Sequence, residues 1–110
     1  MAQLCLLGDE GTMAGRWEIG AQPLAVGRDE TADVQVDDQL LSRRHFVISQ
    51  EGESFLLKDL DSRNGTWVDG RRALAAAMKL RHHDCIAAGR TLFMFSEELP
   101  ASTGSKPPAT

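Results

Sequence analysis

The sequence predicts an all-β fold, either a β-sandwich or a β-barrel. Along the chain of 110 residues, short segments rich in β-branched, aromatic or leucine residues alternate with clusters of Gly, Asp, Asn or Ser, which is the pattern of strands and turns. Strands of this length at this spacing are typical of sandwiches and barrels. The expected strands cover residues 4–7, 17–19, 24–28, 34–36, 46–49, 55–60, 67–68, 85–87 and 91–95.

The order of apolar residues supports individual elements. In segments 33–36 and 91–95 apolar side chains recur at every second position, so one face of each strand would meet a core. We expect Trp67, Phe93 and Phe95 to be core residues. Segment 73–78 holds four alanines in six residues, which favours a helix. It is too short for a stable helix, so a single turn or an irregular link between strands is expected.

Composition indicates one soluble domain. Hydrophobic residues make up 42% of the chain and charged residues 25%, which is ordinary for a globular protein. No apolar run is long enough to span a membrane, and the first residues do not resemble a signal sequence. We therefore expect a cytoplasmic protein without membrane insertion.

Cys5 and Cys85 lie in apolar segments, which favours free buried thiols and leaves a disulfide between them open.

Charge and motif content exclude several classes of function. The formal net charge of −4 argues against a nucleic-acid partner, because such proteins neutralise many phosphates with Lys and Arg. His82, His83 and Cys85 lack the second spaced pair that a zinc site needs, and a surface turn is expected there. Ser42 lies three residues before His45, but no nucleophile motif surrounds them. We expect no metal, no cofactor and no catalytic residue.

Two polar clusters favour binding of a single phosphate. One cluster combines Gly27-Arg28 with residues 42–45, and the other covers residues 59–70. Arginine offers a planar fork of donors that suits a doubly charged oxyanion, while serine hydroxyls and asparagine amides add neutral donors. A local basic site of this kind can exist on an acidic protein.

The order of these clusters resembles the forkhead-associated (FHA) domain. The matching residues are Gly27, Arg28, Ser42, Arg43, Arg44, His45, Asp59, Ser62, Asn64, Gly65, Thr66, Val68, Gly70, Leu80, Asp84, Ile86, Gly89, Phe93 and Phe95. The resemblance spans roughly residues 3 to 97. It implies a β-sandwich of two mainly antiparallel sheets, about eleven short strands, whose loops at one end bind phosphothreonine in an extended peptide.

The resemblance also implies roles for individual residues. In similar domains the residues matching Arg28, Ser42 and Arg43 contact the phosphate, and the residue matching Asn64 bonds the peptide backbone. Arg63 departs from relatives that carry Thr, and it either strengthens phosphate binding or lies on the surface.

A second group of residues is expected to support the site. The histidine matching His45 is a structural brace in the family, and Gly27 and Gly65 are expected to shape the backbone around it. Asn64-Gly65 is also a tight-turn signal by itself, because both residues tolerate a positive φ.

These observations predict a phosphothreonine-dependent module that recruits phosphorylated partner proteins in Ser/Thr-kinase signalling. The expected domain covers residues 1–98, and the small, polar, proline-bearing residues 99–110 are expected to be a flexible tail or linker, so the natural chain is expected to continue. Two alternatives stay open, namely a phosphate-independent interaction scaffold and a recruitment domain of a larger enzyme or secretion component. A monomer is favoured.

Overall fold

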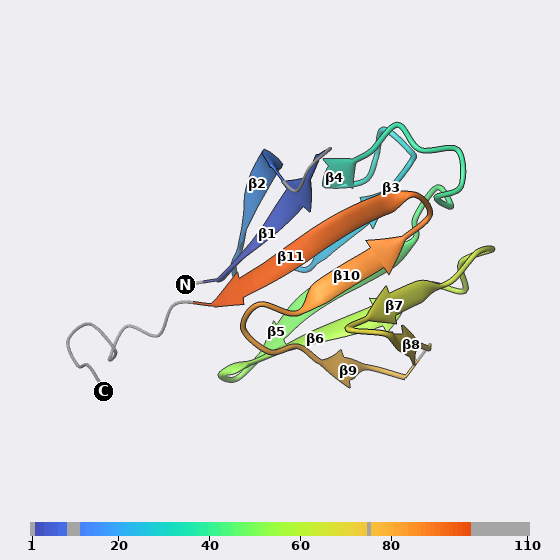
Figure 1. Cartoon of the computed structure of the whole chain (residues 1–110). Helices are drawn as coiled ribbons and strands as arrows, with labels where there is room; N and C mark the ends of the chain where they lie inside the picture. The colour runs from blue at the N-terminus through green and yellow to red at the C-terminus, as the bar shows by residue number, and fades with distance from the viewer. Residues whose placement is uncertain (1, 9–11, 75, 98–110) are drawn as a thin grey trace.

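The computed structural model describes residues 2–8, 12–74 and 76–97, and these form eleven strands in two packed sheets (Figure 1). The first sheet has the order β2 (Met13–Ile19), β1 (Ala2–Leu7), β11 (Thr91–Glu97), β10 (Cys85–Ala88), β7 (Thr66–Val68) and β8 (Arg71–Ala73). The second has the order β4 (Val34–Gln35), β3 (Leu24–Gly27), β5 (Phe46–Glu51), β6 (Ser54–Asp59) and β9 (Met78–Lys79). All strand pairs are antiparallel except the parallel pair β3 and β4. The all-β prediction is confirmed.

The core lies between the two sheets, where aromatic side chains from both meet. Phe46 of β5 packs edge-on against Phe93 of β11, with ring centroids 5.6 Å apart, and Phe55 of β6 packs against Phe95 at 5.5 Å. Phe46, Phe93 and Phe95 are fully buried, and each such burial contributes roughly 1.5–3 kcal/mol. The prediction of Phe93 and Phe95 as core residues is confirmed.

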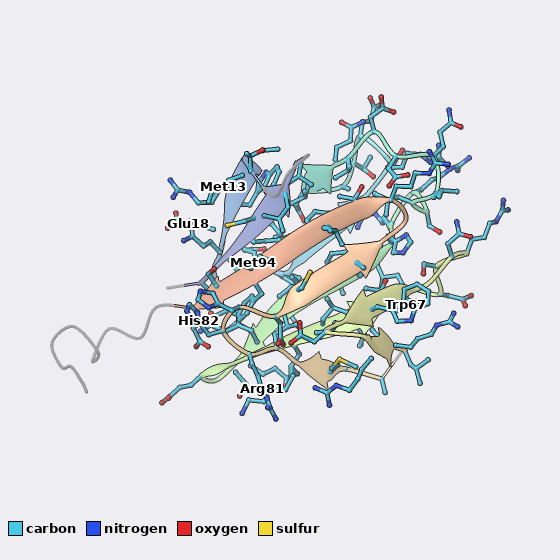
Figure 2. The ribbon with its side chains drawn as sticks, viewed as in Figure 1. Met13, Glu18, Trp67, Arg81, His82 and Met94 are labelled. Carbon is cyan, nitrogen blue, oxygen red and sulfur yellow. The ribbon has the colours of Figure 1, made fainter. Side chains whose placement is uncertain are left out.

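Trp67 is not a core residue, so that prediction is wrong. Its neighbours Thr66 and Val68 point inward and are buried, and strand alternation therefore turns Trp67 outward, where it is 36% exposed. Trp67 and Met94 both project from the outer face of the six-stranded sheet (Figure 2). The Arg72 guanidinium lies over the indole, 5.4 Å from the ring centroid.

Strands β8 and β9 were not expected from the sequence, and the alanine-rich segment between them forms no helix among its described residues. Asp69 and Gly70 adopt φ values of 49° and 83° and connect β7 to β8 as a two-residue hairpin. Asp69 also accepts the Cys85 N–H at 2.8 Å. Between β8 and β9 the described residues 74, 76 and 77 are irregular, in agreement with the expected link; Ala75 lies outside the described residues.

Both cysteines are free. Cys5 and Cys85 each pair with Met94, one from either side, so a whole strand separates them. Two strand spacings place their Cα atoms about 9–10 Å apart, beyond the ~7 Å that a disulfide can bridge. Cys5 is buried and Cys85 is half-buried.

The polar loops gather at one end of the sandwich. The β3–β4, β4–β5 and β6–β7 loops and the β10–β11 turn lie together at the right of Figure 1, whereas β1 begins and β11 ends at the opposite end. No helix that could span a membrane occurs in the part of the chain that the structure describes.

Candidate functional site

A recess of about 300 Å³ opens among the loops at this end. All five residues that the sequence predicts as ligand contacts line it, namely Arg28, Ser42, Arg43, Arg63 and Asn64. Three further lining residues, Gln39, Leu40 and Leu41, come from the β4–β5 loop. In domains similar to this one, loops at this place carry specificity, so the sequence also pointed to residues 37–41. The structure thus brings together residues from three separate segments of the chain.

Gly27 lets the β4–β5 loop lie directly on the end of β3. A Cβ at this position would sit 2.0 Å from the Arg43 carbonyl oxygen, so only glycine allows this approach. The next residue, Arg28, is held twice: its N–H donates to the Ser42 carbonyl at 3.0 Å and its Nε donates to the Leu41 carbonyl at 3.1 Å. The terminal amino groups of its guanidinium therefore remain available to a ligand.

Ser42 and His45 link the β4–β5 loop to the β6–β7 loop. The Ser42 Oγ accepts the Arg63 N–H at 3.0 Å, which leaves the hydroxyl proton to be donated elsewhere. The buried His45 accepts the Ser42 N–H at Nδ1, 3.0 Å away, and bonds the Gly65 carbonyl through Nε2 at 2.8 Å. Because a carbonyl can only accept, Nε2 carries the proton. Neither ring nitrogen of His45 bonds the Ser42 hydroxyl. Ser42 and His45 are therefore not arranged as a catalytic nucleophile with its general base.

Asn64 and Gly65 shape the β6–β7 loop rather than a hairpin, because β6 and β7 belong to different sheets. The Asn64 Nδ2 donates to the Leu40 carbonyl at 2.8 Å, which leaves the amide oxygen and the second N–H to the ligand. Of the pair, only Gly65 has a positive φ, at 87°. A Cβ on Gly65 would also lie 2.9 Å from the Trp67 ring.

Asp59 braces the β6–β7 loop from below, a role that the sequence analysis did not identify. Its carboxylate accepts the Ser62 N–H at 3.0 Å, the Ser62 hydroxyl at 2.6 Å and the Thr66 hydroxyl at 2.7 Å. Burial alone raises the pKa of Asp59, but hydrogen bonds from Ser62 and Thr66 outweigh it, and the pKa lies below the ordinary value. The Asp-x-x-Ser spacing is a turn signal that could have indicated this brace.

The recess is strongly basic. Among residues 2–8, 12–74 and 76–97, no carboxylate forms an ion pair with Arg28, Arg43 or Arg63. Asp29 lies outside the recess; hydrogen bonds from Thr31 lower its pKa, and the Arg43 charge lowers it further. Three arginines therefore line one small recess, and Asp29 outside it offsets part of the Arg43 charge.

Arg44 takes no part in this recess. Its guanidinium turns away and donates to the Thr31 carbonyl at 3.2 Å.

A second recess of about 410 Å³ adjoins the first and shares Gln39 and Leu40 with it. Asp38 links the two sides of this second recess. Its carboxylate accepts the Leu40 N–H at 2.9 Å, the Arg90 N–H at 2.7 Å and the Thr91 hydroxyl at 2.8 Å. Burial raises the pKa of Asp38, but these hydrogen bonds lower it by more, so the carboxylate stays charged. The exposed Asp37 lies beside it, and Arg90, whose charge also lowers the pKa of Asp38, lines the same recess, so both signs of charge are present there.

His82 and His83 lie in an exposed turn, as expected. His83 has a φ of 73°, and the Asp84 carboxylate accepts the Arg81 N–H at 2.7 Å to close the turn. The described ranges contain no group of three His, Cys, Asp or Glu side chains that could hold a metal ion.

Comparison with known proteins identifies the family. The model of the FHA domain family matches residues 24–89, a range that includes every residue lining the basic recess. The chain belongs to the FHA domain family. The match identifies the domain as a binding module, and it confirms the resemblance seen in the sequence.

Individual relatives agree with this assignment. The FHA domain-containing protein FhaB of Mycolicibacterium smegmatis is 33% identical over 84 residues, which cover 76% of this chain and 54% of FhaB. The chain thus spans about half the length of this curated relative.

Solved FHA domains share the fold. The FHA domain of CT664 from Chlamydia trachomatis superposes with a TM-score of 0.79 at 28% identity, covering 89% of this chain and 98% of that one. The MEK1 FHA domain in complex with a phosphothreonine peptide of HOP1 gives a TM-score of 0.71 at 25% identity, covering 86% of this chain and 94% of that one.

Proposed function

We propose that this FHA domain binds phosphothreonine in extended peptides and so recruits phosphorylated proteins in Ser/Thr-kinase signalling. The observation that carries the proposal is the basic recess, which Arg28, Arg43 and Arg63 line together with Ser42, whose hydroxyl proton is left to be donated. The MEK1 FHA domain, which is similar to this chain, binds a phosphothreonine peptide. Phosphorylation by cytoplasmic kinases would make such ligands, and we place the domain's action in that compartment.

The recess geometry suggests how the phosphate is held. A phosphothreonine carries about −1.5 to −2 charges at neutral pH, which Arg28 and Arg43 can match with charge-assisted hydrogen bonds. The Ser42 hydroxyl donates a further bond, and the Asn64 amide oxygen can accept an N–H from the peptide backbone. Unmodified threonine would leave the guanidinium charges unmatched and bind poorly.

The first test is Arg28→Ala with phosphothreonine, phosphoserine and unmodified versions of a degenerate peptide library. Loss of one partner of a charge pair costs roughly 2–5 kcal/mol, so we expect affinity for phosphothreonine peptides to fall about 30-fold or more. Fluorescence anisotropy measures the affinity. Because the Arg28 side chain is exposed, thermal unfolding should change little.

The matched control is Arg71→Ala, which removes an equally exposed arginine from β8, outside the recess. We expect wild-type affinity in this variant. Binding by Arg28→Ala at near wild-type affinity would contradict the assignment. A folded wild-type domain that binds no version of the library would favour the phosphate-independent scaffold instead.

The extent of the module is part of the proposal. We assign binding to residues 1–98, within which the described strands run from Ala2 to Glu97. Residues 98–110 lie outside the described residues, and we propose that the segment from 99 onward serves as a linker. Limited proteolysis followed by anisotropy on the product tests whether residues 1–98 bind alone.

A further inference from the structure

Two consecutive carbonyl groups of the β4–β5 loop orient two of the side chains that line the basic recess. The Leu40 carbonyl accepts the Asn64 Nδ2 at 2.8 Å, and the Leu41 carbonyl accepts the Arg28 Nε at 3.1 Å. Because a carbonyl can only accept, the bond to Leu40 decides which end of the Asn64 amide is left for the ligand. Without that bond the amide is free to rotate and to present its NH2 group to a peptide N–H, which it cannot bond.

The orientation of the Leu40 carbonyl depends on Asp38. The Asp38 carboxylate accepts the Leu40 N–H at 2.9 Å, and the Asp38 main-chain carbonyl accepts the Leu41 N–H at 3.0 Å. In a planar trans peptide unit the N–H and the C=O point in opposite directions, so the Leu40 carbonyl turns away from Asp38 and toward Asn64. Gln39 and Leu40 are exposed, and these hydrogen bonds rather than packing therefore fix this part of the loop.

Asp38 also ties this part of the loop to the β10–β11 turn. Its carboxylate accepts the Arg90 N–H at 2.7 Å and the Thr91 hydroxyl at 2.8 Å. The approach is so close that a Cβ on Gly89 would lie 2.7 Å from a carboxylate oxygen of Asp38. One side chain thus holds donors from two elements that are far apart in the sequence.

The β10–β11 turn and Asn64 belong to the same part of the sheet. β10 pairs with β7, where Ala88 lies opposite Thr66, and Asn64 precedes Thr66 in the β6–β7 loop. A loop that is tied to the β10–β11 turn is therefore held relative to Asn64. Asp38 is not among the residues that line the basic recess, so any effect of Asp38 on a ligand there is indirect.

We infer that Asp38 is a positioning residue for phosphopeptide binding. Its carboxylate holds the Leu40 carbonyl in place, and this carbonyl orients the Asn64 amide for contact with the peptide backbone. The inference rests on the proposed function and adds to it a residue outside the recess.

Arg28 depends less on the Asp38 side chain than Asn64 does. The Leu41 N–H bonds the main-chain carbonyl of Asp38, which any substitution keeps. The next residue, Ser42, is held from elsewhere by His45. The Leu41 carbonyl that orients Arg28 therefore keeps its support when the carboxylate is removed.

The first test is a double-mutant cycle of Asp38→Ala and Asn64→Ala. Fluorescence anisotropy measures affinity for the degenerate phosphothreonine library, which suits a contact to the peptide backbone because that contact does not depend on peptide sequence. One hydrogen bond is worth about 2- to 10-fold in affinity, and we expect each single variant to lose a factor in this range. The double variant should bind no more weakly than Asn64→Ala, because the amide that Asp38 positions is already absent.

Charge alone predicts the opposite result for Asp38→Ala. Removal of a negative charge near the recess favours a dianionic phosphate, so a fall in affinity cannot come from electrostatics. The matched control is Asp84→Ala, which removes a carboxylate that accepts the Arg81 N–H in the turn before β10, outside the recess. We expect wild-type affinity in this control.

A second variant keeps the test decisive if Asp38→Ala does not fold. Thr91→Val removes one of the three hydrogen bonds to the Asp38 carboxylate and leaves the β4–β5 loop unchanged in sequence. We expect a smaller loss of affinity than in Asp38→Ala, and again no further loss in the Asn64→Ala background.

The second test observes the Asn64 side chain without any peptide. In isotope-labelled protein, the NMR signals of Asn64 Nδ2 and Arg28 Nε report the bonds to the Leu40 and Leu41 carbonyls. In Asp38→Ala the Asn64 signals should move toward those of a free amide, whereas the Arg28 signal should change little. Asp84→Ala should change neither.

Three results would overturn the inference: wild-type affinity in Asp38→Ala, losses that multiply in the double variant, or unchanged Asn64 amide signals in Asp38→Ala. The first two leave the proposed function intact, because the wild-type domain still binds. If the wild-type domain binds no phosphothreonine peptide, the proposed function fails, and the amide signals alone decide whether Asp38 orients Asn64.

Discussion

At the scale of single residues, the closest contact in the site lies at Gly27. A methyl group there would overlap the Arg43 carbonyl, so we expect Gly27→Ala to push the β4–β5 loop off β3. The strain should cost roughly 1–3 kcal/mol of unfolding free energy, and displacement of Arg43 should weaken phosphopeptide binding as well. Urea denaturation and anisotropy measure the two effects. In the control Gly20→Ala the added Cβ meets nothing within 4 Å. We therefore expect its unfolding free energy and its phosphopeptide affinity to equal those of wild type within error.

Unchanged affinity in Gly27→Ala would show that the loop can shift without moving its arginine. The Gly-Arg pair would then matter only through Arg28.

Single residues also show where sequence reasoning succeeds. The resemblance to FHA domains implied that Arg28, Ser42 and Arg43 belong to one site, and the structure places all three at one recess. Trp67 was misplaced because aromatic character predicts burial but says nothing of strand register. Asn64-Gly65 was interpreted as a tight-turn signal because both residues tolerate a positive φ, yet only Gly65 adopts one, since a loop between two sheets has different geometry from a hairpin.

At the scale of elements, His45 joins the two loops that form the recess. His45→Ala would leave the part-buried Ser42 N–H and the buried Gly65 carbonyl without their partner, at about 1–3 kcal/mol for the buried group and less for the part-buried one. We expect a loss of about 3 kcal/mol in unfolding free energy together with weaker peptide binding. His45→Asn can restore only the bond to the Ser42 N–H, so its stability should be intermediate.

Hydrogen exchange separates this linking role from general loss of packing. In His45→Asn, exchange at the Arg63 amide should accelerate more than exchange at the core residues Phe46 and Ile48. Equal acceleration throughout would mean that His45 stabilises the fold as a whole and not the loops.

The strands themselves were largely predictable, with informative exceptions. In Thr91–Glu97 the buried Phe93 and Phe95 alternate with less buried neighbours, because one face of the strand meets the core. β8 and β9 were missed because Arg71–Ala73 is polar and Met78–Lys79 has only two residues. β9 pairs with β6, which is distant in the chain, so that pairing leaves no local signal, whereas β8 pairs with β7 across Asp69-Gly70, a local hairpin signal that the prediction did not use. The shape of the recess could not be predicted either. Leu40 and Leu41 contribute to it through backbone carbonyl groups, which the identity of the side chain does not reveal.

At the scale of the whole molecule, two aspartates connect separate elements and make stability depend on pH. Asp59 bonds Ser62 and Thr66, and Asp38 joins the β4–β5 loop to the β10–β11 turn. Both have a pKa below the ordinary value of 3.8. A carboxylate with a lowered pKa stabilises the fold above its unfolded pKa, and the contribution is lost as pH falls through the folded pKa. We therefore expect unfolding free energy to decrease from about pH 4 downward.

The contribution of Asp59 is isolated by comparison with Asp59→Asn, because an amide keeps the shape but not the charge. At neutral pH we expect the variant to be less stable by about 1–3 kcal/mol, since it cannot accept all three hydrogen bonds. As the wild-type carboxylate becomes protonated below pH 4, the two proteins should converge. Urea denaturation at a series of pH values measures both curves. A difference that stays constant down to the acid transition would mean that the Asp59 charge does not contribute and that its role is purely one of shape.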